Sequence, residues 1–274
     1  LLPSRVRHDL GEFYTPDWLA EDLLRRLESP FYSGVDADLG AATLENIRLL
    51  DPACGSGTFL ILAVGNLRSR MTKLGYSEDE ILQTALSSVV GIDLNPLAVL
   101  AARVNCLLSV VDLIPHRREE IEFPVYLADS VSPPMAGTTL IGSDRKILPL
   151  VVGSLPVPSG IETEPDLSAL TEVLESCVVS VVDPDIFLER VTKKIDARLS
   201  PQDLETLREL YQLLQNLHDQ GLNGIWARVL KNAFMPLFLK DFDFVVGNPP
   251  WIGWESLSES YRERTMPLWQ QYGL

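Results

Sequence analysis

The sequence has no long uncharged apolar run, and it holds few of the residues that cross-link a fold or bind metal. Without such a run we expect neither a membrane span nor a secretory signal in these 274 residues. The three cysteines, Cys54, Cys106 and Cys177, are far apart and follow no metal-ligand spacing, and only three histidines are present. We therefore expect no disulfide framework and no metal site, and the composition suits a cytoplasmic protein.

Basic residues are scarce as well. The chain has 23 lysines and arginines against 38 aspartates and glutamates, which gives a net charge of −15. A free-standing nucleic-acid binder usually carries a basic footprint, and here the visible cluster is limited to Arg5, Arg7 and His8. Whatever this chain does to nucleic acid, it does not hold the backbone by bulk charge.

The most informative stretch runs from Phe242 to Trp251, with the sequence FDFVVGNPPW. Its aromatic and β-branched run predicts a buried strand that ends abruptly at glycine and two prolines. Pro249 and Pro250 stiffen the turn and leave carbonyls free as acceptors. Such a turn offers a planar amine the Asn248 oxygen, the Pro249 carbonyl and the face of Trp251. The alternative is an ordinary strand-ending turn with a core tryptophan.

A strand, a glycine-rich turn and a helix follow one another near residue 50. The strand is expected over residues 47–50, and Asp51 at its end could meet an ammonium group. Gly55 and Gly57 form a Gly-x-Gly pair, but the third glycine of the dinucleotide fingerprint would fall at Leu60 and is absent. A plain tight turn remains the alternative.

Two further strands are expected to end on acids. The strand at residues 89–93 ends on Asp93, which suits the two hydroxyls of a ribose, although it could instead cap the helix that Asn95 and Pro96 begin. The strand at residues 122–130 brings Asp129, which could accept a hydrogen bond from an adenine amino group or simply form an Asp-Ser turn.

Near the N-terminus, Thr15 is expected to cap a helix with Pro16 at its first position. Its free N–H groups could face a carboxylate or phosphate, or the segment could be a capped amphipathic helix and no more. One apolar side of this helix is predicted from helical spacing. That side consists of Trp18, Leu19, Leu23, Leu24 and Leu27.

Residues 131–166 are rich in Pro, Gly, Ser and Thr and predict a long excursion that can hold a hairpin. Three helices are expected to follow. The middle one has clear ends, with Ser200 as N-cap, Pro201 at its first position and Gly221 beyond its end. Its leucine stripe favours packing over a partner site.

Four motifs in this order resemble those of gamma-class N6-adenine-specific DNA methyltransferases: GEFYTP at residues 11–16, DPACGSG at 51–57, GID at 91–93 and NPPW at 248–251. That class includes methylases of restriction–modification and phage-defence systems. The NPPW element is shared with methyltransferases that act on protein glutamine or RNA, and the N-terminal element shifts the balance toward DNA.

The resemblance implies an α/β fold, the Rossmann-like sheet of class I S-adenosylmethionine-dependent methyltransferases, incomplete in this chain and carrying a mostly helical insertion. It divides the chain into an N-terminal helical segment (1–46), a cofactor-binding core (47–130), an insertion (131–240), and a catalytic strand-loop and tail (241–274). We expect a longer protein whose further part reads DNA, and restriction or defence subunits as possible partners.

The resemblance also implies roles for particular residues. Thr15 and Asp51 would hold the methionine end of S-adenosylmethionine, Asp93 the ribose, Leu94 the adenine ring and Asp129 its amino group. Ser130 stands where the family often has an aromatic residue. The implied catalytic residues are Asn248, Pro249, Pro250 and Trp251, and the implied cofactor-binding residues are Phe13, Tyr14, Thr15, Pro16, Asp51, Ala53, Cys54, Gly55, Gly57, Thr58, Phe59, Asp93, Leu94 and Asp129.

The expected function is therefore methyl transfer from S-adenosylmethionine to the N6 amino group of adenine in DNA. Two alternatives stay open: a methyltransferase for protein glutamine or RNA that uses the same loop, and a non-catalytic scaffold that binds the cofactor.

Overall fold

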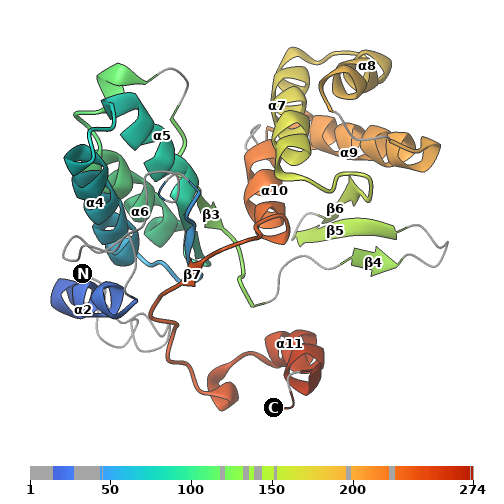
Figure 1. Cartoon of the computed structure of the whole chain (residues 1–274). Helices are drawn as coiled ribbons and strands as arrows, with labels where there is room; N and C mark the ends of the chain where they lie inside the picture. Colours follow the sequence, from blue (N-terminus) through green and yellow to red (C-terminus); the bar gives the residue numbers. More distant parts are fainter. Residues whose placement is uncertain are drawn as a thin grey trace. The chain divides into compact units, whose positions relative to one another are not determined.

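The computed structural model describes residues 15–27, 44, 46–117, 121–131, 136–138, 144–150, 153–195, 199–221, 226–271 and 273. The chain divides into two compact units, residues 1–131 with 241–274, and residues 132–240 (Figure 1). Each unit is described by itself. Within the described residues, no helix combines the length and the apolar character that crossing a membrane requires. The four-part functional division expected from the sequence stays a prediction.

The first unit is built on a sheet of four strands, β1 (Leu49–Asp51), β2 (Val89–Asp93), β3 (Val125–Leu127) and β7 (Phe244–Val245). All three pairings are parallel, and the strand order is β3-β2-β1-β7. The chain runs outward from β1 to β3 and returns on the other side of β1, so the winding reverses between β1 and β7. In open α/β sheets such a reversal marks the ligand crevice. The predicted α/β class with a parallel sheet is confirmed.

Helices cover this sheet, and their ends follow local sequence signals. Ser77 begins α5 with a capping box, because its hydroxyl accepts from the Glu80 N–H while the Glu80 carboxylate accepts from the Ser77 N–H at 2.8 Å. Asn95 begins α6 and accepts from the Leu97 N–H at 2.9 Å. The helical segments of this unit are α2 (Asp17–Arg26), α4 (Thr58–Lys73), α5 (Glu78–Ser88), α6 (Pro96–Ser109), η1 (Ile114–His116), η3 (Trp254–Ser256) and α11 (Glu259–Gln271).

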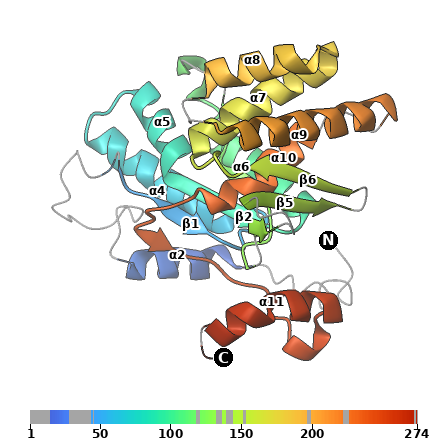
Figure 2. The same cartoon turned by 90° about the vertical axis from the view of Figure 1, so that its right-hand side faces the viewer.

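The core of this unit lies around α4, which packs against α2, α5 and α6 (Figure 2). Leu60 of α4 is fully buried there. Gly91 of β2 is needed for this packing, because a Cβ on it would lie 2.7 Å from Leu60 Cδ1 and 3.0 Å from Cys54 Sγ. Leu60 therefore occupies, with a core side chain, the position where the dinucleotide fingerprint has its third glycine.

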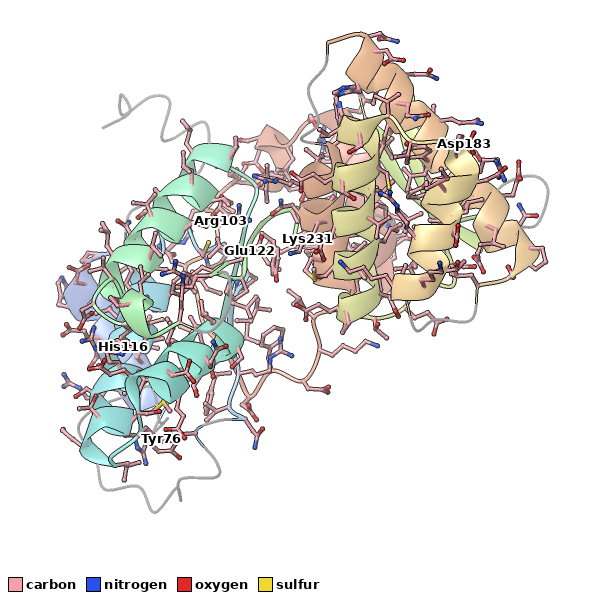
Figure 3. All side chains as sticks on the ribbon, turned by 90° about the horizontal axis from the view of Figure 1, so that it is seen from above. Tyr76, Arg103, His116, Glu122, Asp183 and Lys231 are labelled. Carbon is pink, nitrogen blue, oxygen red and sulfur yellow. The ribbon has the colours of Figure 1, made fainter. Side chains whose placement is uncertain are left out.

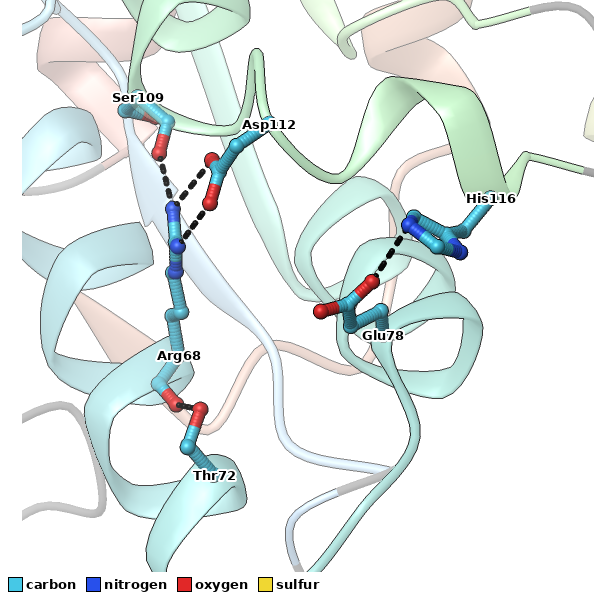
Figure 4. A network of polar contacts seen from close by, with 6 residues as sticks. All are labelled: Arg68, Thr72, Glu78, Ser109, Asp112 and His116. Carbon is cyan, nitrogen blue, oxygen red and sulfur yellow. Dashed lines mark hydrogen bonds and ion pairs between the residues drawn. The ribbon is translucent and has the colours of Figure 1, made fainter.

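Polar contacts join the helices at the surface (Figure 4). The Arg68 guanidinium forms a two-pronged pair with the Asp112 carboxylate and donates to the Ser109 carbonyl at 3.1 Å. His116 Nε2 lies 2.6 Å from the Glu78 carboxylate. The Arg68 hydrogen bond lowers the pKa of Asp112. Because these side chains are largely exposed, the pairs align helices more than they stabilise the fold.

The second unit combines an antiparallel sheet with a helical layer. The sheet has the order β4-β5-β6, so the expected hairpin is a three-stranded meander. Its elements are β4 (Ala136–Thr138), β5 (Asp144–Leu150), β6 (Gly153–Pro158), α7 (Glu164–Ser180), α8 (Pro184–Lys194), α9 (Pro201–Asp219), α10 (Trp226–Phe234) and η2 (Met235–Leu237).

The expectation of three helices in this unit is wrong, because four α-helices are present among the described residues. The first predicted helix is two, α7 and α8. Asp183, labelled in Figure 3, caps α8 by accepting from the Asp185 N–H at 2.8 Å, with Pro184 at the first position. Proline lacks the N–H needed to continue α7 and suits a new helix start.

Two expectations about α2 are also wrong. Pro16, and not Thr15, is the N-cap, and no side-chain hydrogen bond caps this helix. Trp18 is 70% exposed, whereas Ala20 and Leu24 are fully buried. The buried face is thus centred on i and i+4 positions that pack on α4, and the tryptophan lies to one side of it.

The strand predicted as buried, β7, is a two-residue strand that pairs only with β1 in the described part of the sheet. Val245 is 62% exposed. The start of β7 is fixed instead by polar contacts, since the Arg48 N–H donates to Asp243 Oδ2 at 2.8 Å and its guanidinium lies 4.7 Å above the Phe242 ring. An apolar β-branched run alone does not distinguish an edge strand from a central one.

Candidate functional site

Four predicted site residues lie at the same edge of the first unit's sheet. Asp51 ends β1, Asp93 ends β2, Asp129 follows β3 and Asn248 follows β7. Because the strands are parallel, their carboxyl ends open on one edge, and β1 and β7 flank the point where the winding reverses.

Asp51 is the most unusual group at this edge, with only 1% of its surface exposed. Its Oδ1 accepts a hydrogen bond from the Ala53 N–H at 3.1 Å, while Oδ2 has no hydrogen-bond partner within the described part of the chain. Burial raises the pKa of Asp51 to about 7, against the lowering effect of the Ala53 bond, and the charge of Asp93 raises it further. A buried carboxylate with an unused oxygen is a site for a cation.

The glycine-rich turn after Asp51 is held by both neighbouring elements. Gly55 and Gly57 have φ values of 53° and 88°, which favour glycine. Gly57 also lies close to α6, since a Cβ on it would be 3.1 Å from Ala102 Cβ. Asn105 of α6 donates to the Ser56 carbonyl at 3.0 Å, a contact that the sequence motifs do not reveal. Contacts with α6 therefore fix the backbone of this turn in one conformation.

The other implied residues of this turn divide into core and edge. Cys54 and Phe59 are buried, so their side chains belong to the core and only their backbone is available to a ligand. Burial raises the pKa of the Cys54 thiol well above its ordinary range, which excludes a ready thiolate. Ala53 and Thr58 are half-buried at the edge.

Asp93 is half-buried, and both its oxygens accept backbone hydrogen bonds. Oδ2 accepts from the Gly55 N–H and Oδ1 from the Asn95 N–H, each at 2.8 Å. The helix-cap alternative for Asp93 is wrong, because Asn95 caps α6. Each carboxylate oxygen has a second lone pair, so the group can still accept from hydroxyls. Leu94 beside it is 66% exposed.

Asp129 forms the turn that the sequence left as an alternative, since its Oδ1 accepts from the Val131 N–H at 3.0 Å. The same oxygen accepts from the hydroxyl of Tyr261 on α11 at 3.3 Å. Edge-to-face packing of Trp254 and Trp269, with ring centroids 5.2 Å apart, joins α11 to the segment that follows the NPPW loop. Sequence reasoning missed Tyr261, for which no motif gives a signal.

Arg103 is another residue that the motifs did not indicate. It lies on α6 (Figure 3), and its Nε and Nη2 donate to the Val125 carbonyl of β3 at 2.9 and 2.6 Å. This fork fixes α6 against the strand that delivers Asp129 to the edge.

The NPPW loop meets the N-terminal motif directly. Asn248 Nδ2 donates to Thr15 Oγ1 at 3.2 Å, and Trp251 Nε1 donates to Asn248 Oδ1 at 3.1 Å. Pro249 and Pro250 are exposed, and Trp251 is 74% exposed. The alternative of a core tryptophan is therefore wrong.

Gly247, which precedes Asn248, brings the loop against Asp51. A Cβ on Gly247 would lie 2.5 Å from Asp51 Oδ1, a distance that no side chain could occupy. The glycine before the NPP sequence was a visible signal for such a close approach. The NPPW loop and Asp51 thus lie side by side.

Two implied cofactor-binding residues, Phe13 and Tyr14, lie outside the described residues. Thr15 and Pro16 are half-buried at the start of α2. Where the structure describes the chain, no group of three or more His, Cys, Asp and Glu side chains is arranged to hold a metal ion.

Two family models match this chain. Residues 39–119 match a model described as MmeI, DNA-methyltransferase domain, and residues 87–272 match the Eco57I restriction-modification methylase model. The first range contains the Asp51 turn, and the second contains the NPPW loop and α11.

One curated relative is the "Adenine-specific methyltransferase PglX" of Streptomyces coelicolor (strain ATCC BAA-471 / A3(2) / M145), 32% identical over 137 residues. The match covers 46% of this chain and 10% of PglX, so the chain spans about a tenth of that relative. A nuclease-deletion mutant of the Type ISP restriction-modification enzyme LlaGI, solved with a DNA substrate mimic, matches with a TM-score of 0.35 and 13% identity over 68% of this chain and 17% of that one. A TM-score this low does not establish a shared fold.

The Eco57I model covers more than half of the chain and includes three of the four residues at the sheet edge. The resemblance to restriction–modification methylases is thereby confirmed. The chain belongs to the Eco57I restriction-modification methylase family.

Proposed function

We propose that this protein transfers a methyl group from S-adenosylmethionine to the N6 amino group of adenine in DNA, within a restriction–modification or phage-defence system. One observation carries the proposal: Gly247 places the NPPW loop against the buried Asp51 carboxylate. The contact of Asn248 with Thr15 of the N-terminal motif adds to it. Family membership and the adenine specificity in the relative's name support it. Such a reaction on cellular DNA implies a cytoplasmic protein.

The residues at the edge fit S-adenosylmethionine. The buried Oδ2 of Asp51 has no hydrogen-bond partner in the described structure, and the α-ammonium group of the cofactor would provide one. Asp93 has the acceptor capacity for ribose hydroxyls, and the exposed Leu94 offers an apolar surface for adenine. When bound, the cofactor supplies a methyl group on a positively charged sulfur, which is a good leaving group.

Asn248 and Pro249 would act on the target amine. The exocyclic nitrogen of adenine is a poor nucleophile because its lone pair is delocalised into the ring. Two acceptors on its two N–H bonds, the Asn248 oxygen and the Pro249 carbonyl, favour a pyramidal nitrogen whose lone pair is available. Positioning and preorganised acceptors can supply most of the catalysis, so no covalent intermediate is required.

Trp251 would receive the target base. A base inside a duplex must leave the stack before an enzyme can act on it, at a cost of a few kcal/mol. Stacking on an aromatic ring returns about 1–3 kcal/mol. The 74% exposure of Trp251 leaves its ring accessible for this purpose.

The test is a transfer assay with the full-length protein and methyl-labelled S-adenosylmethionine. Duplex DNA, RNA and a glutamine-containing protein fraction are offered separately, and Asn248→Ala serves as the matched control. We expect label in DNA, recovered as N6-methyladenine and absent with the control. Label in RNA or protein alone would assign the loop to another substrate, and no label in any arm would favour a non-catalytic scaffold.

A further inference from the structure

We propose that Thr15 and Trp251 are positioning residues that fix the orientation of the Asn248 carboxamide, so that its oxygen and not its amino group faces the target amine. The inference deepens the proposed function and rests on it. It assigns to the hydroxyl of the N-terminal motif a role toward the target base that is separate from cofactor binding.

The two hydrogen bonds act on opposite ends of one amide. Trp251 Nε1 donates to Asn248 Oδ1 at 3.1 Å, and Asn248 Nδ2 donates to Thr15 Oγ1 at 3.2 Å. An indole N–H can only donate, so the amide atom facing it must be the oxygen. Trp251 therefore selects one of the two orientations, and the threonine hydroxyl accepts from the amino end in that same orientation.

The selection matters because the two orientations of a carboxamide have nearly the same shape. Packing cannot distinguish them, and hydrogen bonds must. In the flipped orientation the Asn248 amino group would face the N–H bonds of the target amine, which puts donor against donor and removes one of the two proposed acceptors. Loss of one ordinary hydrogen bond shifts the orientation ratio about five- to tenfold.

The start of α2 supports the assignment of the Thr15 hydroxyl. A threonine next to a helix start commonly caps it, yet no side-chain hydrogen bond caps α2. The hydroxyl instead lies at the Asn248 amide, 233 residues further along the chain. The half-buried Thr15 thus does not cap α2 with its hydroxyl, which instead makes a long-range contact with the loop.

A pair of substitutions separates this role from cofactor binding. Thr15→Val keeps the shape and removes the hydroxyl, whereas Thr15→Ser keeps the hydroxyl. We expect Thr15→Val to lower kcat for DNA methylation, by at most about five- to tenfold, with the Kd for S-adenosylmethionine unchanged, and Thr15→Ser to recover most of the loss. Trp251→Phe, which keeps an aromatic face without the N–H, should lower kcat by a similar factor. A Thr15→Val loss confined to cofactor Kd, or an unchanged kcat, would overturn the proposal.

A second readout does not depend on activity. The indole ¹⁵N–¹H signal of Trp251, assigned with Trp251→Phe, reports its hydrogen bond to Asn248. We expect the signal to move in Asn248→Ala and in Thr15→Val and to stay in place in Thr15→Ser. If the indole signal did not move in Asn248→Ala, the proposed amide orientation would be refuted, regardless of the methylation activity. If the parent methylates no DNA but the signal responds as expected, the orientation stands and the proposed DNA reaction is what fails.

Discussion

Two buried aspartates, one in each unit, show how differently the two regions treat the same side chain. Asp203 in the second unit is 6% exposed and accepts hydrogen bonds from Ser200 and Gly160 N–H groups and from Ser159 and Ser200 hydroxyls. Although burial alone raises its pKa, these bonds lower it. Asp51 in the first unit is more deeply buried and accepts one bond, and its pKa is raised to about 7.

The difference separates an acid whose hydrogen bonds are all made within the fold from one that we propose binds the cofactor. Asp203 joins β6 to the start of α9, and all its acceptor needs are met within the fold. Asp51 has a buried oxygen without a partner in the described structure, which costs stability unless a ligand provides one. The unsatisfied oxygen of Asp51 lies beside the winding reversal, which is where we propose that the cofactor binds.

Removing the catalytic amide should have the largest effect. We expect Asn248→Ala to lower methyl transfer by about a hundred- to a thousandfold, as the loss of a preorganised charge-stabilising group does in other enzymes. The Kd for S-adenosylmethionine should change little, because the side chain contacts Thr15 and Trp251 and is proposed to face the target. Steady-state kinetics and calorimetry give the two numbers, and substantial remaining turnover to adenine N6 would contradict the mechanism.

Asp51→Asn should separate binding from stability. Loss of a buried charge-assisted bond to an ammonium group is worth about 1.5–3 kcal/mol, which is roughly a 10- to 150-fold weaker cofactor Kd. Although Asp51→Asn weakens cofactor binding, it should raise the free energy of unfolding. The folded pKa of about 7 lies above the ordinary 3.8, so the parent loses stability as pH rises between these values, by as much as about 4 kcal/mol.

The comparison of unfolding free energies at two pH values tests this. At pH 8 the Asn variant should be more stable than the parent without cofactor, and at pH 4 the difference should have largely gone. A variant that is less stable than the parent at both pH values would mean that Asp51 is as structural as Asp203.

Asp203→Asn should have the opposite effects to Asp51→Asn on stability and on cofactor binding. It removes an acceptor from a satisfied network, so we expect a loss of about 1–3 kcal/mol in unfolding free energy and no change in cofactor Kd. Denaturant unfolding measures the loss of stability, and calorimetry on the same samples measures the cofactor Kd. An Asp203 variant that bound cofactor more weakly would remove the contrast between the two acids.

The smallest effect is expected at the third strand. Tyr261→Phe removes the hydroxyl that donates to Asp129 but keeps the ring. We expect the cofactor Kd to weaken about two- to fivefold, within the range of one partly buried hydrogen bond, with kcat unchanged. A change in kcat alone would place α11 with the target base instead of the cofactor.

Local signals in the sequence predicted much of the first unit. The capping residue Asn95 predicted where α6 begins, because a cap depends on a few neighbouring residues. The apolar runs of β1 and β2 and the acids at their ends were likewise local features. The same holds for the positive φ values at Gly55 and Gly57.

What the sequence did not predict depends on which distant segments meet. The pairing of β7 with β1 brings Gly247 onto Asp51, and the Thr15–Asn248 contact spans almost the whole chain. The exposure of Trp18 was missed for the same reason, since apolar spacing gives a helix face without saying what covers it. The break at Pro184 is different, because the Asp183–Pro184 helix start is a local signal that the sequence does contain.

The most direct test of the account is the proton balance of cofactor binding at pH 6. With a pKa of about 7, Asp51 is mostly protonated there in the free protein, and pairing with an ammonium group requires it to ionise. Calorimetry in buffers of different ionisation enthalpy should show release of nearly one proton when the parent binds S-adenosylmethionine, and of none when Asp51→Asn binds. Equal proton release by the two proteins would contradict the claim that Asp51 is the cofactor's partner.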